Sequence, residues 1–213
     1  MYNLKHNNYN KNPKNSTIYT PLEVSQFIFE LLKDKVEKRG IIFDPCCGKG
    51  SLLKPWKKTG YGTWGNDKDK RLKKWLSPNE IVKNTLDFLT TELKDWKLLV
   101  KWKITLILCN PPFNGYKGKL GSEVWLDKII ELFGKEVPVV LFAPVGFCSN
   151  LTLESKRLEK FENGTYPPIV SRITLPKNIF EGVIFHSEIL IFNIKGLKGH
   201  YFLPKIANYE ISI

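Results

Sequence analysis

Short apolar runs recur along this chain, and stretches with the spacing of amphipathic helices lie between several of them. The runs lie at Ile41–Phe43, Tyr61–Gly65, Ile81–Val82, Ile104–Cys109 and Val137–Phe142. Runs of this kind are typical of buried strands, and strands that alternate with helices form a mostly parallel sheet covered on both faces. The pattern therefore predicts an α/β protein with a doubly wound, mostly parallel sheet.

An amphipathic helix is expected ahead of the first strand. The segment from Thr20 onward spaces its apolar residues at helical intervals, with Thr20 placed as the cap and Pro21 in the first turn. We expect this helix to end near Gly40. A second helical pattern covers Glu123–Leu132.

The last two apolar segments, Ile169–Leu175 and Ile184–Ile194, are separated by a stretch that contains Pro, Asn and Gly. A short connection between two strands favours an antiparallel pair. We therefore expect a C-terminal antiparallel hairpin that ends the sheet.

The length of 213 residues is enough for one sizeable core but too small for two ordinary domains and a linker. Residues 1–16 hold six Asn and three Lys and almost nothing apolar, so they bury too little surface to offset the entropy of ordering. We expect a flexible basic arm over residues 1–16 and a single domain over residues 17–213.

The chain carries a formal net charge of +12. Such an excess of Lys and Arg favours a polyanionic partner such as nucleic acid over a small acidic substrate. Chains rich in Lys and Asn also arise from AT-rich coding without any such partner, and this alternative stays open.

The four cysteines have neither C-x-x-C spacing nor a histidine pair beside them, and Cys46 and Cys47 are adjacent, which argues against a disulfide framework. We therefore expect no metal. The sequence has no apolar run long enough to cross a membrane and begins without a signal peptide, so we expect a cytoplasmic protein with no membrane span.

The segment from Asp44 to Ser51 reads Asp-Pro-Cys-Cys-Gly-Lys-Gly-Ser and follows the first expected strand. Glycines at this place let the backbone approach a ligand closely, as in α/β nucleotide sites. The segment is neither a G-x-G-x-x-G fingerprint nor a P-loop. Because it opens with Asp, its charge suits a cationic ligand better than a pyrophosphate.

Two later acidic residues come at the ends of the next expected strands. Asp67 lies where α/β nucleotide sites place an acid on ribose hydroxyls, and Asp87, followed by Phe88, could reach the edge of an adenine ring. A single Asp at a strand end is more often a cap or a solvated turn residue. In order along the chain, however, these residues match the needs of a nucleoside site.

The most specific signal is Asn110-Pro111-Pro112-Phe113, directly after an apolar strand. The two prolines hold the backbone stiff and extended at the end of the sheet where open α/β proteins bind ligands. The Asn110 amide oxygen and a neighbouring carbonyl can together accept both hydrogens of one amino group. Phe113 can stack on the ring that carries this amine.

Taken in order, the segments TPLEV, DPCCGKGS, GND, LDF and NPPF resemble the gamma-type S-adenosylmethionine-dependent DNA adenine N6-methyltransferases. The resemblance covers roughly residues 17–195. It implies a Rossmann-like class I methyltransferase fold, S-adenosylmethionine as cofactor and DNA as partner. It also implies methyl transfer to the N6 amine of an adenine that is flipped out or single-stranded.

The resemblance implies roles for particular residues. Tyr19, Thr20 and Pro21 would flank the methionine end of the cofactor, and the Asp44–Gly50 loop would wrap its methionine and sugar. Asp67 would bind the ribose hydroxyls. The implied residues of this loop and of the adenine site are Asp44, Pro45, Cys46, Gly48, Gly50, Asp87 and Phe88, and Asn110 is implied to contact the cofactor as well.

The substrate side is implied in the same way. Asn110 and the Pro111 carbonyl would hold the target amine, Pro112 would stiffen the turn, and Phe113 would stack on the extruded base. A second aromatic wall is expected from either Phe180 or Phe185. The glycine-rich loop Asn114–Gly121, with Tyr116, is the expected lid over the substrate.

The suggested mechanism is direct in-line displacement at the sulfonium methyl, with the amine as nucleophile. Two acceptors that draw the amine toward tetrahedral geometry would free its lone pair, and positioning would supply much of the remaining rate enhancement. Alternatives are a methyltransferase that acts on RNA or on a protein glutamine, and a non-catalytic nucleic-acid-binding subunit of the same fold. Phe113 and the excess of basic residues favour DNA over a protein glutamine as the substrate, but they distinguish DNA from RNA less well.

The sequence leaves little room for a separate target-recognition domain. The protein is therefore expected to read a very short site, to be promiscuous, or to borrow recognition from a specificity subunit, as in restriction-modification. The small size also fits a viral or mobile-element enzyme.

The stretch from Lys54 to Lys74 holds eight basic residues interleaved with aromatics, which predicts either a phosphate-tracking surface or a solvated face with buried aromatics.

Overall fold

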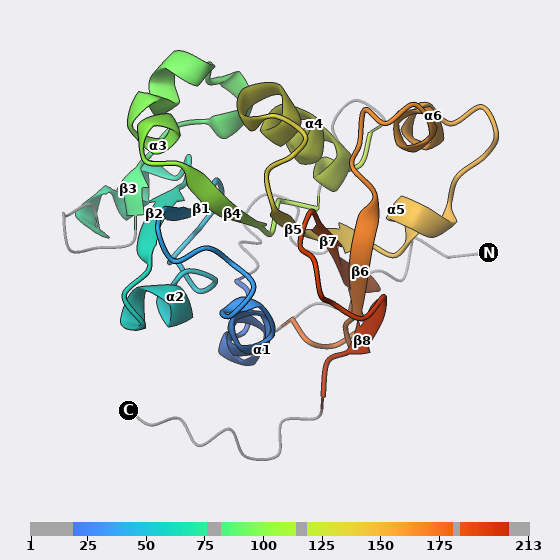
Figure 1. Ribbon diagram of the computed structural model, residues 1–213, viewed down its shortest axis with the longest axis horizontal. Coiled ribbons are helices and arrows are strands. Elements are labelled where there is room, and N and C mark those ends of the chain that lie inside the picture. The colour runs from blue at the N-terminus through green and yellow to red at the C-terminus, as the bar shows by residue number, and fades with distance from the viewer. Residues whose placement is uncertain (1–18, 76–81, 114–118, 181–183, 205–213) are drawn as a thin grey trace.

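The computed structural model describes residues 19–75, 82–113, 119–180 and 184–204. Within these ranges the chain forms one eight-stranded sheet in the order β3-β2-β1-β4-β5-β7-β6-β8 (Figure 1). The strands are β1 (Ile41–Asp44), β2 (Gly62–Asn66), β3 (Val82–Asn84), β4 (Ile104–Cys109), β5 (Val139–Pro144), β6 (Ile169–Thr174), β7 (Ser187–Phe192) and β8 (His200–Phe202).

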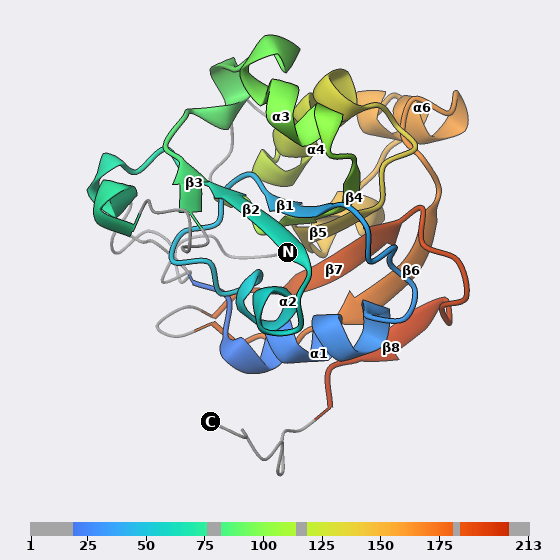
Figure 2. The same ribbon diagram turned by 60° about the vertical axis from the view of Figure 1, so that its left-hand side comes forward.

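Helices cover both faces of this sheet. The α-helices are α1 (Leu22–Leu32), α2 (Lys54–Lys58), α3 (Lys97–Lys101), α4 (Gly121–Phe133), α5 (Gly146–Ser149) and α6 (Lys156–Glu162), and the 3-10 helices are η3 (Lys70–Trp75), η4 (Phe88–Thr90) and η5 (Leu93–Trp96). Figure 2 shows α1 and α2 on one face, and α3, α4 and α6 on the other. The expected doubly wound α/β architecture is confirmed.

The alternation of side chains across the strands gives the molecule two hydrophobic cores. On one face, Ile28 of α1 and Trp56 of α2 pack with the inward residues of the sheet, such as Leu106. On the other face, Trp125 and Leu126 of α4 pack with residues that include Ile107. A strand covered on both sides must be apolar throughout, which is why β4 and β5 are nearly continuous apolar runs.

The strand directions match the expectation for the first five strands. Parallel pairing joins β3, β2, β1, β4 and β5, and β7 is antiparallel to both β5 and β6. The expected antiparallel pair is therefore present, but it does not end the sheet. The short strand β8 pairs parallel to β6 and forms the outer edge.

The first helix differs from the expectation at both ends. Its N-cap is Pro21, no side chain caps it, and Thr20 is therefore not a cap. The helix stops at Leu32 rather than near Gly40, because beyond it only Val36 continues the apolar face that packs on the core. The basic arm expected over residues 1–16 lies outside the described residues.

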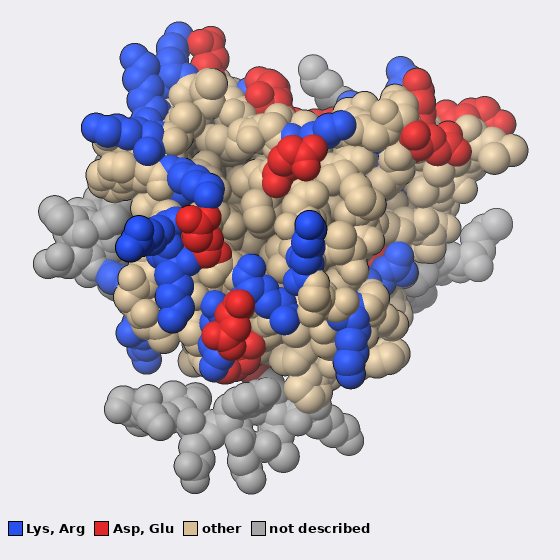
Figure 3. All heavy atoms as spheres, in the orientation of Figure 1, with Lys and Arg blue, Asp and Glu red and all other residues tan. Residues whose placement is uncertain are grey.

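Lys and Arg side chains gather on one part of the surface. Figure 3 shows them in blue mainly over the side of the molecule that carries α2 and α3, with fewer carboxylates among them. None of the helices among the described residues has both the length and the apolar character needed to cross a membrane.

Candidate functional site

A cavity of about 500 Å³ lies at the carboxyl ends of the parallel strands. Volumes of this size are typical of small-ligand sites, and the carboxyl edge of an open α/β sheet is their usual place. Thirteen of the residues predicted from the sequence line it: Tyr19, Thr20, Asp44, Pro45, Cys46, Gly48, Asp67, Asp87, Phe88, Asn110, Pro111, Pro112 and Phe113. Pro21, Gly50, Phe180 and Phe185 lie outside this lining, and Tyr116 lies outside the described residues.

The loop after β1 is shaped by glycines in conformations that other residues rarely adopt. Gly48 has φ 51° and Gly50 has φ 77°. A Cβ atom on Gly48 would lie 3.0 Å from the Tyr19 ring, so the ring packs directly on the loop backbone. The Gly50 N–H donates to the Cys47 carbonyl at 2.7 Å and closes the turn. Gly50 thus shapes the loop without lining the cavity.

Asp44 ends β1 as a carboxyl with only 2% of its surface exposed. One oxygen accepts a hydrogen bond from the Cys46 N–H at 3.0 Å, and no cation pairs with it among the described residues. Burial raises the pKa of Asp44 well above its ordinary value, and the nearby Asp67 carboxylate raises it further. A buried carboxyl of this kind is a ready partner for a cationic ligand.

Asp67 and Asn66 hold the loops of the cavity together. The Asp67 carboxylate accepts from the Gly48 N–H at 2.8 Å and from the Asp69 N–H at 2.9 Å. Asn66 is fully buried, and its side chain bonds to the Pro45 carbonyl and to both the N–H and the carbonyl of Leu86, each at 3.0 Å. Sequence reasoning missed Asn66, although its place beside Asp67 at the strand end was the available signal.

The far side of the cavity is formed around η4. Asp87 is exposed and caps this helix by accepting from the Leu89 N–H at 3.3 Å. Phe88 is 1% exposed and stacks on Trp125 with ring centroids 5.2 Å apart. Phe88 is therefore a core residue as well as a lining residue. Leu86 and Trp125 add apolar lining that the sequence did not predict.

Asn110 follows the last residue of β4 directly. Its amide nitrogen donates to the Thr20 hydroxyl at 3.0 Å. Its amide oxygen is buried and has no hydrogen-bond partner among the described residues. An unpaired buried acceptor costs about 1–3 kcal/mol, so its presence calls for a functional explanation.

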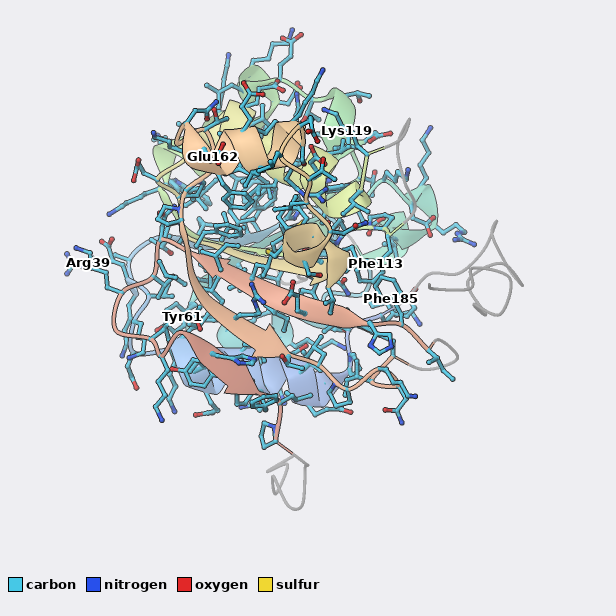
Figure 4. The ribbon with its side chains drawn as sticks, turned by 90° about the vertical axis from the view of Figure 1, so that its right-hand side faces the viewer. Arg39, Tyr61, Phe113, Lys119, Glu162 and Phe185 are labelled. Atoms are coloured by element: carbon cyan, nitrogen blue, oxygen red, sulfur yellow. The ribbon has the colours of Figure 1, made fainter. Side chains whose placement is uncertain are left out.

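Three phenylalanines meet beside this turn. The Phe113 ring lies 4.8 Å from the Phe185 ring and 6.1 Å from the Phe180 ring, centroid to centroid. Phe180 is 2% exposed and belongs to the core, whereas Phe185 is only half-buried. In Figure 4, Phe113 and Phe185 lie side by side at one end of the sheet.

The basic stretch from Lys54 to Lys74 divides into two parts. Trp56 and Tyr61 are buried and pack on each other, so they are core residues and not platforms for bases. Lys68, Lys70 and Arg71 line the cavity instead. Arg71 is held there by a bidentate ion pair with Asp69, whose closest contact is 2.7 Å.

The cavity thus combines a buried acid, a glycine-shaped loop, apolar walls and an unpaired amide oxygen. Its chemistry suits a cationic nucleoside-like ligand next to an amine. The four cysteines are free, and burial raises the pKa of the Cys46 and Cys109 thiols, so neither is poised as a nucleophile. Among the described residues no group of three or more His, Cys, Asp and Glu could hold a metal.

Solved structures share this fold. A modification subunit described as part of a type I restriction enzyme from Vibrio vulnificus is 16% identical, with a TM-score of 0.60 over 86% of this chain and 46% of that one. The methyltransferase subunit of a type I restriction-modification system from Streptococcus thermophilus is 20% identical, with a TM-score of 0.56 over 87% and 47%.

A third structure, described as a class I S-adenosylmethionine-dependent methyltransferase from Listeria monocytogenes, is 16% identical, with a TM-score of 0.59 over 86% of this chain and 64% of that one. At these identities the likeness shows a common fold, that of the class I methyltransferases. The chain spans about half the length of the two restriction-system subunits. No curated protein matches it.

The sequence itself matches a family model. The model of the N-6 DNA methylases matches residues 1–123, which include the loop after β1 and the Asn-Pro-Pro-Phe turn. Family and fold together imply S-adenosylmethionine as the cofactor. The chain belongs to the N-6 DNA methylase family.

Proposed function

We propose that this protein transfers the methyl group of S-adenosylmethionine to the N6 amine of adenine in DNA. The observation that carries the proposal is the place of Asn110-Pro111-Pro112-Phe113 on the wall of the cavity formed by the loop after β1. The turn that would bind the target amine thus lies beside a cavity whose buried acid and apolar walls suit a cationic nucleoside.

The residues of the cavity fit S-adenosylmethionine. The buried Asp44 carboxyl suits the positive charge of the methionine end, and Asp67, which also lines the cavity, would bind the ribose hydroxyls. Leu86, Phe88 and Trp125 offer apolar surface for the adenine. When bound, the cofactor supplies a methyl group on a sulfonium, which is transferred without a covalent enzyme intermediate.

The chain's own residues would act on the amine. The Asn110 amide oxygen and the Pro111 carbonyl would accept its two hydrogens and make its lone pair available. Phe113 would stack on the base, and Phe185, being only half-buried, is the better candidate for the second aromatic wall. A base in duplex DNA is stacked, so the target would be flipped out or single-stranded.

We also propose that residues 17–213 form one catalytic domain, because a single sheet runs through the described part of that range. DNA is the proposed partner, and the net charge of +12 favours it. The fold shared with modification subunits of type I restriction systems supports a specificity subunit as a second partner. RNA is the alternative substrate, because the same net positive charge also favours binding of RNA.

The test uses purified protein and labelled S-adenosylmethionine with duplex DNA, single-stranded DNA, RNA and a protein extract in parallel. We expect N6-methyladenine in DNA, identified by chromatography of the nucleosides. Label in RNA or protein but not in DNA would overturn the proposal.

The Asn110→Ala variant tests the assigned site. We expect it to lose transfer while it keeps nearly normal cofactor binding, because Ala removes the amine acceptor and leaves the loop after β1 intact. The control is Asn150→Ala, which changes an exposed Asn outside the cavity lining and should keep full activity. Full turnover by Asn110→Ala would show that the turn has another role.

A further inference from the structure

Thr20 and Asn110 are 90 residues apart in sequence, and the structure joins them by one hydrogen bond. The Asn110 amide nitrogen donates to the Thr20 hydroxyl oxygen at 3.0 Å. Thr20 is 7% exposed, so water has little access to this bond. The start of the first helix is thereby tied to the end of β4.

The hydroxyl of Thr20 is not used by the helix that it precedes. Pro21 is the N-cap of α1, and no side chain caps this end. The Pro21 carbonyl accepts instead from the N–H and the hydroxyl of Ser25, both at 3.2 Å. Asn110 is the hydrogen-bond partner of the Thr20 side chain among the described residues.

The two ends of an Asn amide have almost the same shape but opposite hydrogen-bonding roles. If the Asn110 amide turned over, it would present two N–H donors to an amine that also needs acceptors. The bond to Thr20 holds the nitrogen on the helix side, and the oxygen remains unpaired on the other side. A hydroxyl can donate as well as accept, so this bond fixes the position of the amide group at the cavity wall, and the orientation seen here leaves the oxygen free for an amine.

We propose that Thr20 is a positioning residue for methyl transfer, which acts by anchoring the Asn110 side chain at the wall of the cavity. This inference rests on the proposed function. It differs from the role that the sequence resemblance implies for Thr20, which is contact with the methionine end of the cofactor. The two roles predict different effects on rate and on cofactor affinity.

The test compares three variants of the full chain. Thr20→Val keeps the shape and removes the hydroxyl, Thr20→Ser keeps the hydroxyl, and Ser25→Ala removes another buried hydroxyl of the same segment. Ser25→Ala is a matched control because the Ser25 N–H still donates to the Pro21 carbonyl. Calorimetry measures the Kd of S-adenosylmethionine, and single-turnover transfer to DNA measures the rate.

We expect the transfer rate of Thr20→Val to fall about tenfold or more, because the buried Asn110 nitrogen loses its partner. The cofactor Kd should stay within about twofold of wild type, because the proposed role of Thr20 acts on the amine acceptor and not on the cofactor. Thr20→Ser and Ser25→Ala should keep the rate. A Thr20→Val variant that keeps its rate, or that loses cofactor affinity instead of rate, would overturn the inference.

A spectroscopic readout separates this inference from the proposed function. In protein with ¹⁵N-labelled Asn, the Asn110 side-chain signals are assigned by their absence in Asn110→Ala. We expect these signals to shift and to exchange faster with water in Thr20→Val, but not in Thr20→Ser. Unchanged signals in Thr20→Val would overturn the positioning role, whereas a wild type that methylates no substrate would overturn the proposed function alone.

Discussion

The environment of Asp44 indicates the charge of the expected ligand most directly. It is buried at the end of β1, and burial raises its pKa well above the ordinary value. In the free protein the carboxyl therefore retains its proton to a higher pH than an exposed Asp. A cation beside it would favour the charged form and lower its pKa.

The first prediction concerns the pH dependence of cofactor binding. A cationic cofactor bound beside Asp44 would lower the pKa of this carboxyl, so the complex would hold fewer protons than the free protein, and we expect affinity to rise with pH until Asp44 is ionised in both states. Calorimetry from about pH 5 to about pH 7 measures this rise. Asp44→Asn should bind more weakly and lose the pH dependence. An equal slope in wild type and Asp44→Asn would assign the titration to another group.

At this scale the sequence identified most of the cavity but not the contacts that hold it. Asp44 ends a strand, Asp67 and Asn110 follow strands directly, and a parallel sheet brings such positions to one edge, so their meeting was predictable. The side-chain contacts of Thr20 and Asn66 were not predictable. Each depends on a hydrogen bond to a residue at least 20 positions away, and only the packed loops show that contact.

Among the elements, α6 is attached to α4 by buried charges. Glu123 of α4 is 5% exposed and pairs with Arg157 at 3.1 Å and with Lys160 at 3.5 Å. Lys160 also contacts Asp127 at 2.6 Å. This cluster fixes the segment between β5 and β6 against the helix that follows the Asn-Pro-Pro-Phe turn.

The second prediction tests this cluster. Glu123→Ala leaves two partly buried cations without one of their partners, and we expect a loss of about 3 kcal/mol in the free energy of unfolding. Glu37→Ala removes an exposed pair with Lys103 and should cost less than about 0.5 kcal/mol. Urea unfolding followed by circular dichroism measures both. Equal losses would show that the buried pair contributes no more than the exposed one.

The elements themselves were predictable where the apolar pattern was continuous. β4 occupies the expected residues Ile104–Cys109, and α4 exceeds its expected range by only a few residues. β8 was missed because it has three residues and an exposed edge, so its sequence carries no buried pattern. The early end of α1 was missed because a run of charged residues is compatible with either a helix or a turn.

For the whole molecule, the charge of +12 was visible in the sequence, but its distribution was not. Three of its cations, Lys68, Lys70 and Arg71, lie on the wall of the cavity. A polyanion that enters the site would meet them, and each phosphate contact releases counterions. The fold places these residues there because η3 follows β2 at the edge of the sheet where the cavity lies.

The third prediction is that DNA affinity falls at least about tenfold between about 50 and 200 mM salt, whereas cofactor affinity changes little. Lys70→Gln should lower the slope of log K against log salt by about one. Lys101→Gln, in the helix that leads into the amino end of β4, should leave the slope unchanged. Fluorescence anisotropy with labelled duplex measures the salt dependence of DNA binding in the wild type and in both variants. Equal slopes in the two variants would show that DNA does not contact Lys70.

The central position of β7 has a consequence for synthesis of the chain. Residues 187–192 pair with β5 on one side and with β6 on the other, although both of those strands leave the ribosome earlier. Until β7 emerges, the nascent chain carries two bare strand edges, which are prone to pair with other chains. Translation must therefore proceed almost through the whole sheet before those edges are closed, and chaperone protection would matter most in that interval.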